Sequence, residues 1–228
     1  MMSDNNIKTD NNSQNSANRP QDVASNPNAI EALNQYLKSA AGTREGRSIP
    51  PLEKWHPEQV ADMDLVIKAN GEWWHEGGQM TRESLVSLFA TILWKEENNG
   101  VVEYFLKTPV QKLRIQVEDA PLLINDVGIV KEANHSWLEF TTTTGDVVRL
   151  DDEHPITLQT YTADDSADNQ ADTQVKPYMP VRNGLTALIA RNAFYHLTEI
   201  GELTERAGET ILTLQSGGQS YELSMPAG

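Results

Sequence analysis

Residues 63–75 read MDLVIKANGEWWH, and this stretch contains the clearest local fold signal in the chain. Apolar and polar side chains alternate up to Ile67, which is typical of a half-buried β-strand. The Asn70-Gly71 pair then supplies two residues that tolerate the backbone of a tight hairpin turn. A second short segment follows and carries two tryptophans. We therefore predict a β-hairpin at this place.

An amphipathic helix is predicted directly after the hairpin. Thr81 is a candidate N-cap for it, and residues 96–100 would end it. Apolar residues at spacings of i, i+3, i+4, i+7 and i+8 give the helix one face that can be buried. These residues are Leu85, Leu88, Phe89, Ile92 and Leu93.

The rest of the chain mostly predicts short strands. The expected strands are 102–107, 113–118, 122 to about 130, 136–142, 146–150 and 156–161, with a last hairpin at 210–215 and 220–224. A second amphipathic helix is predicted after Pro177-Tyr178, from Leu185, Leu188, Ile189 and Leu197. Many strands with two principal helices favour an α+β fold with two small β-rich halves over a doubly wound sheet.

Two segments differ in composition from a packed domain. Residues 1–26 are rich in Asn, Ser and Asp, and we expect them to be a disordered tail. With one short amphipathic helix they form a leader over residues 1–51. Residues 162–174 are acidic and low in complexity, and we expect an exposed loop. The remaining chain divides into an N-terminal half, 52–120, and a C-terminal half, 121–228, which contains this loop.

The sequence contains an internal similarity. Residues 82–90 read RESLVSLFA and residues 182–190 read RNGLTALIA, so an arginine, two leucines, a large apolar residue and an alanine coincide. Helical periodicity alone explains the apolar matches, but it does not explain the arginine. We therefore predict a duplicated strand-helix-strand motif, with a helix beginning near Arg82 and another near Arg182.

An arginine at the start of a helix faces the positive end of the helix dipole, where Asp or Glu is preferred. The same choice at Arg82 and Arg182 predicts a nearby anion for each. Two interpretations remain open. Each arginine bridges a carboxylate of this acidic chain, or each contacts an anionic ligand together with helix-terminal N–H groups.

The charge distribution bears on the class of partner. Residues 1–50 carry five basic and five acidic groups, so the whole net charge of −15 falls on residues 51–228. Such a field repels phosphate backbones, so we expect no binding to nucleic acid polymers. The chain has no cysteine and no apolar run long enough for a membrane span, so we expect no disulfide, no membrane partner and a cytoplasmic protein.

Other candidate chemistry is sparse. His56 with Asp62 and Asp64 is the best metal-like or hydrolytic cluster, but no paired-histidine spacing supports it, and we expect no metal and no cofactor. Trp55 and Trp73 could stack on a base or pack in the core.

Several blocks together resemble a known bacterial family. They include Trp55-His56-Pro57, Asp62-Met63-Asp64, Thr108-Pro109-Val110, Asp119-Ala120-Pro121, Glu153-His154-Pro155 and Val181-Arg182, in that order. This pattern is similar to the family called domain of unknown function 1285, over residues 52 to about 224. The resemblance implies a core with domain duplication and a C-terminal half superficially like a pleckstrin-homology fold. It also implies a ligand site between the halves and a role in signalling, with no established reaction.

The leading hypothesis is a regulatory module that binds a small anionic or nucleotide-like ligand between its halves. Arg82 and Arg182 would contact the anion, and Trp55, His56 and Trp73 would form walls. One alternative is a small-molecule hydrolase that uses His56 with Asp62 or Asp64. The other is a structural interaction protein without a ligand.

Overall fold

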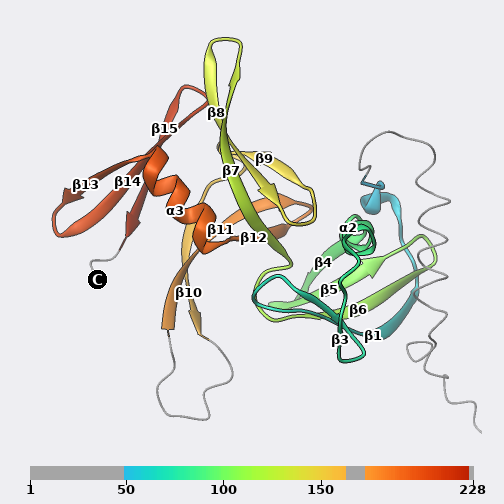
Figure 1. Cartoon of the computed structure of the whole chain (residues 1–228). Coiled ribbons are helices and arrows are strands. Elements are labelled where there is room, and N and C mark those ends of the chain that lie inside the picture. Colours follow the sequence, from blue (N-terminus) through green and yellow to red (C-terminus); the bar gives the residue numbers. More distant parts are fainter. Residues whose placement is uncertain (1–48, 163–172, 226–228) are drawn as a thin grey trace, which may run out of the picture.

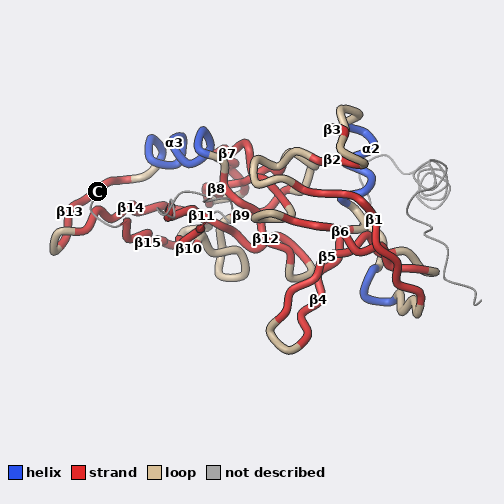
Figure 2. The backbone as a smooth tube through the Cα atoms, turned by 90° about the horizontal axis from the view of Figure 1, so that it is seen from below, coloured by secondary structure: helices blue, strands red, loops and turns tan. Residues whose placement is uncertain are grey.

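The structure is a computed structural model that describes residues 49–162 and 173–225. The predicted leader, apart from residues 49–51, and nearly all of the predicted acidic loop lie outside the described residues. Figure 1 shows two β-rich parts side by side, and Figure 2 shows that strands make up most of the backbone. Two β-rich halves with few helices confirm that part of the fold prediction.

The N-terminal half contains one six-stranded sheet with the order β3-β2-β1-β6-β5-β4. A short 3-10 helix, Leu52–Lys54, precedes the sheet, and helix α2, Glu83–Ala90, connects β3 to β4. The strands are β1 Gln59–Ile67, β2 Trp73–His75, β3 Gly78–Gln79, β4 Leu93–Asn98, β5 Val101–Lys107 and β6 Gln111–Val117.

The predicted hairpin is present as β1 and β2, with Ile67 opposite Trp73. The amide of Gly71 donates to the Lys68 carbonyl at 2.8 Å, and the Lys68 amide donates to the Glu72 carbonyl at 2.8 Å. Gly71 has φ +84°, a backbone conformation that favours glycine. A Cβ at this position would lie 2.7 Å from Cδ2 of Leu123, so the missing side chain also lets the hairpin turn approach the C-terminal half closely.

The C-terminal half contains a second six-stranded sheet, with the order β10-β11-β12-β7-β8-β9. Its strands are β7 Leu122–Glu132, β8 His135–Thr142, β9 Val147–Arg149, β10 Thr157–Thr162, β11 Thr173–Arg182 and β12 Leu185–Ile189. Helix α3, Arg191–Ile200, follows this sheet. A separate three-stranded sheet ends the described chain, with β13 Glu202–Arg206, β14 Glu209–Ser216 and β15 Gln219–Met225.

The two large sheets share one topology. Each consists of two three-stranded antiparallel meanders, and the first strand of the first meander pairs in parallel with the last strand of the second. In the N-terminal sheet the parallel pair is β1 with β6, and in the C-terminal sheet it is β7 with β12. The duplication therefore concerns the whole sheet, with helix α2 between the meanders of one copy and no helix at that place in the other.

The predicted helix at residues 185–197 is wrong in its first half. Residues 185–189 form strand β12, in which Leu185, Ala187 and Ile189 are buried in alternation, as the period of a strand requires. Asn183 and Gly184 have φ of +49° and +73°, so this Asn-Gly pair turns the chain between β11 and β12. The helix begins only at Arg191, and Arg182 is the last residue of a strand. The matched arginines therefore do not start equivalent helices.

Helix α2 is also shorter than predicted. Phe89 and Ala90 are its buried residues, Thr91 is its C-cap, and Leu93 already belongs to β4. Arg82, not Thr81, is the N-cap residue, and no side chain caps this end. Most of the buried hydrophobic residues of both halves form one continuous cluster, from Leu52 to Leu223.

Candidate functional site

A groove of about 730 Å³ lies where the two halves meet. The turn of the first hairpin contributes one wall, and strands β7, β10, β11 and β12 with the start of α3 contribute the others. Sites for small ligands typically have volumes of about 300–1,000 Å³, so the groove has a suitable size. Its lining residues are Ala69, Asn70, Leu123, Leu158, Gln174, Val175, Lys176, Pro177, Leu188, Ile189, Ala190, Arg191, Phe194 and Tyr195.

Local structure explains how these segments converge. The parallel pairing of β12 with β7 sets Leu188 opposite Leu123. The chain leaves β12 directly into α3, and the Ala190 amide donates to the Ile124 carbonyl at 2.8 Å. The close approach of Gly71 to Leu123 brings the hairpin turn of the N-terminal half to the same place.

One of the two cations in the groove is already paired. The Nζ of Lys176 lies 2.8 Å from the carboxylate of Asp119 and 3.2 Å from the centre of the Tyr161 ring. Asp119 also accepts a hydrogen bond from the Tyr178 hydroxyl at 2.6 Å, and its side chain is only 4% exposed. Burial and this hydrogen bond raise the pKa of the Tyr178 hydroxyl. Asp119 precedes β7, so the cluster fixes strand β11 to the junction of the halves.

The second cation, Arg191, is the first residue of α3 and is exposed. It forms no ion pair with any described residue. No side chain caps this helix, and its first turn contains no acidic residue. The positive end of the helix dipole and the guanidinium of Arg191 therefore both lie at the groove.

Arg182 has a different environment, a buried polar cluster. Its Nε lies 2.7 Å from the carboxylate of Asp146, and its Nη2 donates to the Ala90 carbonyl at 2.5 Å. The hydroxyls of Thr142 and Thr144 also donate to Asp146, at 3.3 and 3.2 Å. Asp146 is 4% exposed in its side chain and Arg182 13%. Because Ala90 ends helix α2 of the N-terminal half, Arg182 connects the two halves.

A separate cavity of about 280 Å³ lies beside this cluster and is lined by Arg182, Asp146 and Ile49, among others. The Nη1 of Arg182 is buried and has no hydrogen-bond partner among the described residues. Of the two predicted anion contacts, Arg182 thus bridges a carboxylate. Arg82 is exposed and is paired with no described residue.

The predicted wall residues do not line the groove. Trp73 is 3% exposed and belongs to the hydrophobic core of the N-terminal half, and the half-buried Trp55 packs against that core. His56 is exposed. The carboxylate of Asp62 accepts a hydrogen bond from Nη1 of Arg114 at 2.7 Å. No group of three or more metal-ligating side chains occurs in the described ranges.

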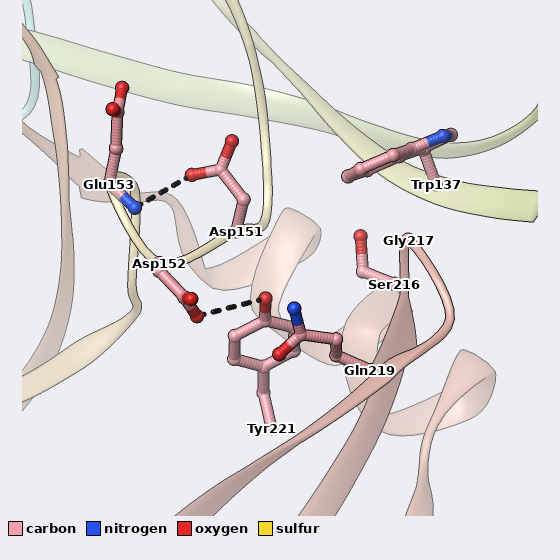
Figure 3. A pocket seen from close by; sticks show the side chains of 8 residues that line it. All are labelled: Trp137, Asp151, Asp152, Glu153, Ser216, Gly217, Gln219 and Tyr221. Atoms are coloured by element: carbon pink, nitrogen blue, oxygen red, sulfur yellow. Dashed lines mark hydrogen bonds between the residues drawn. The ribbon is translucent and has the colours of Figure 1, made fainter.

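A further cavity, of about 240 Å³, lies between the C-terminal six-stranded sheet and the three-stranded sheet (Figure 3). The Tyr221 hydroxyl donates to Asp152 at 3.4 Å, and Asp151 accepts from the Glu153 and His154 amides at 2.9 Å each. Burial raises the pKa of the Asp151 carboxyl. The hydrogen bonds to this carboxyl from the Glu153 and His154 amides and from the His154 ring outweigh burial and hold the pKa below its usual value. The carboxylates of Asp151 and Asp152 therefore have structural partners.

The turn of the last hairpin lies against Trp137, and both line this cavity. A Cβ on Gly217 would lie 2.5 Å from the Trp137 ring, so only glycine fits under the indole. The Gly217 amide donates to the Ser136 carbonyl at 2.9 Å, and Ser216 hydrogen-bonds both the Leu138 amide and the Leu150 carbonyl. These contacts attach the three-stranded sheet to the six-stranded one.

The fold and the groove define a class: a two-part α+β protein with a duplicated mixed sheet and a mostly apolar groove at the junction. None of the helices in the described part of the chain is long and apolar enough to cross a membrane. The residues that sequence reasoning missed are the groove-lining ones of β11, β12 and α3. The Asn183-Gly184 pair was the signal that could have revealed them, because it is the same turn signal as in the first hairpin.

Comparisons with known proteins agree with this class. Residues 50–120 match the family described as "Domain of unknown function (DUF1285), N-terminal domain", and residues 121–223 match "Protein of unknown function (DUF1285), C-terminal domain". The chain therefore belongs to the DUF1285 family, as its sequence blocks indicated.

Two crystal structures of DUF1285 family proteins are similar to this chain. The one from Silicibacter pomeroyi DSS-3 is 32% identical, with a TM-score of 0.62, over 83% of this chain and 94% of that chain. The one from Shewanella baltica OS155 is 32% identical, with a TM-score of 0.40, over 60% of this chain and 91% of that chain. No match is found among curated proteins.

Proposed function

We propose that this protein is a ligand-binding regulatory module whose small-molecule ligand occupies the junction groove. One observation carries the proposal: the walls of the groove come from both halves of the chain. A ligand seated there contacts the hairpin turn at Ala69 and Asn70 together with β11, β12 and α3. It therefore favours the arrangement of the halves that fits it best, which is the physical basis of a ligand-driven response.

The chemistry of the lining supports binding rather than catalysis. The described lining residues include no histidine, no carboxylate, no serine and no threonine. Hydrolysis requires a positioned base or nucleophile, and such groups are usually of these types. The alternative of a hydrolase based on His56 has no support from the groove, since His56 does not line it.

The proposal moves the site away from the residues that the sequence suggested. Arg182 pairs with Asp146 and donates a hydrogen bond to the Ala90 carbonyl, and Trp73 is buried in the core. In the proposed site, Arg191 contacts the anion, and Phe194 and Tyr195 form the aromatic walls.

The test is a thermal-shift screen of the full chain against a panel of small anions, nucleotides and amphiphiles. A ligand at 100 times its dissociation constant should add about 2.7 kcal/mol to the free energy of unfolding. Two variants fill the groove from opposite walls, Ala69→Trp from the N-terminal half and Val175→Trp from the C-terminal half. Ile129→Trp is the control, since Ile129 is 55% exposed and Val175 48% exposed, but Ile129 lies outside the groove.

We expect both filling variants to remove the stabilisation and the control to retain it. Stabilisation that persists in both filling variants would place the ligand elsewhere and refute the proposal. A single filling variant that merely fails to fold does not decide the result, because the second enters from the other wall.

A further inference from the structure

The groove is electrostatically unlike the rest of the chain. The chain has 33 acidic and 18 basic residues, yet the described groove lining contains Lys176 and Arg191 and no Asp or Glu. In a chain with this excess of acid, the charged side chains of the described lining are thus all basic. Because exposed charges are screened over about 10 Å, the lining and its immediate neighbours decide the local sign.

Only one of these two cations is free to meet a ligand. Asp119 lies 2.8 Å from Lys176 and cancels its charge, and the Tyr161 ring covers the same ammonium group. Glu118, which accepts a hydrogen bond from the Ala69 amide behind the hairpin wall, is likewise paired with Lys68 at 2.6 Å. Arg191 is left as the one lining cation with no ion pair to a described residue.

The position of Arg191 at the start of α3 makes a nearby anion more favourable. A cation at the first residue of a helix faces the positive end of the dipole, which is unfavourable. Helix α2 has Glu83 in its first turn, whereas the first turn of α3 contains no acidic residue. An external anion at the groove would interact with both positive groups.

The remaining lining is mainly apolar. Leucine, valine, proline and isoleucine residues of β7, β10, β11 and β12 line the groove together with Phe194 and Tyr195 of α3. A site with one unpaired cation and an apolar lining is complementary to a ligand that has one anionic group and an apolar body. A nucleotide triphosphate carries several negative charges, and the described lining contains too few cations to neutralise them.

We infer that the groove takes an amphipathic molecule with one anionic group and an apolar body. The anionic group lies at Arg191 and the start of α3, and the apolar body lies along Leu158, Val175 and Leu188. This inference rests on the proposed function and specifies its ligand class.

The experiment is isothermal titration calorimetry of the full chain with decanoate, 1-decanol and ATP, each below the concentration at which it aggregates. Decanoate and 1-decanol share the apolar body and differ in the charged head. The variant Arg191→Gln removes the free cation. Arg206→Gln is its matched control, because it changes the net charge equally on an exposed arginine that lies outside the groove.

We expect decanoate to bind at least about tenfold more tightly than 1-decanol, since a charge-assisted hydrogen bond contributes about that factor. Arg191→Gln should remove most of the affinity advantage of decanoate over 1-decanol, and Arg206→Gln should leave it unchanged.

Equal affinity for decanoate and 1-decanol, or equal losses in both arginine variants, would overturn the anionic part of the inference. Binding of ATP without decanoate, abolished by Val175→Trp, would overturn the ligand class and leave the proposed function standing. Decanoate binding that survives both Ala69→Trp and Val175→Trp would contradict the inference and the proposed function together. Absence of decanoate binding would overturn the ligand class alone.

Discussion

Arg182 and Ala90 belong to different halves of the chain, and the guanidinium of Arg182 donates a hydrogen bond to the Ala90 carbonyl at 2.5 Å. The carbonyl is one of those at the C-terminal end of α2, which have no partner within the helix. A cation is also favoured at this negative end of the helix dipole. Arg182 therefore stabilises helix α2 from the other half, while Asp146 neutralises its charge.

The first prediction follows from this contact. Arg182→Ala should lower the free energy of unfolding by about 3 kcal/mol, because it removes the guanidinium that pairs with the buried carboxylate of Asp146. The hydroxyls of Thr142 and Thr144 still donate to Asp146, which keeps the loss near the lower end for such changes. Arg82→Ala removes an exposed side chain and should change the stability by less than about 0.5 kcal/mol. Urea denaturation of both variants measures the difference, and similar losses in the two would contradict the structural role of Arg182.

The second prediction concerns the approach of the halves at Gly71. Gly71→Ala combines a positive φ with a Cβ 2.7 Å from Leu123, and it should cost about 2–4 kcal/mol. Gly100→Ala is the control, because Gly100 also has a positive φ of +80° but has no atom near its Cβ position. It should cost only about 1 kcal/mol. Adding Leu123→Ala to Gly71→Ala should cost less than the sum of the single changes, and strict additivity would rule out the clash.

The third prediction concerns Lys107, which is 5% exposed and lies with its Nζ 3.7 Å from the centre of the Trp94 ring. Burial lowers the pKa of this lysine. Between the lowered pKa and the ordinary value of 10.5, the unfolded chain binds more protons than the folded chain, so stability from this group rises with pH. Below that window the folded chain carries the full cost of the buried charge.

Lys107→Met should therefore lose this rise in stability at alkaline pH, as measured by denaturation at a series of pH values up to 10.5. Lys131→Met, at an exposed lysine, is the control and should keep the rise. A rise that is identical in Lys107→Met and the wild type would show that another group causes it.

Lys107 and Arg182 have equivalent positions in the two six-stranded sheets. Lys107 is the last residue of β5, and Arg182 is the last residue of β11, which is the corresponding strand of the second sheet. The Lys107 amide donates to the Ile92 carbonyl at 2.8 Å, close in sequence to the Ala90 carbonyl that Arg182 contacts. Lys107 and Arg182 thus occupy the same place in the two sheets, at the end of equivalent strands.

Local sequence signals predicted most of the strands because their causes are local. The alternation up to Ile67 and the Asn70-Gly71 turn determine the first hairpin without help from the rest of the fold. The first half of the second predicted helix was wrong, because Leu185 and Ile189 have the i, i+4 spacing of a helix face and also fit the alternating burial of a strand. Strand β13 has only exposed residues and so leaves no burial pattern in the sequence.

The groove could not be predicted, because its lining comes from distant segments that only the parallel pairing of β7 with β12 and the approach at Gly71 bring together. The prediction that a helix-start arginine contacts an anion stays a prediction, and the arginine that lines the groove is Arg191 and not Arg82 or Arg182. The pleckstrin-homology likeness of the C-terminal half stays a prediction.

The central claim, that a ligand occupies the groove between both halves, is tested most directly by hydrogen exchange of the full chain with and without saturating decanoate. We predict slower exchange of amides in residues 68–72, 174–178 and 188–196, which belong to both halves, and unchanged exchange in residues 219–225. Protection confined to one half, or centred on the cluster around Asp146 and Arg182, would contradict the claim.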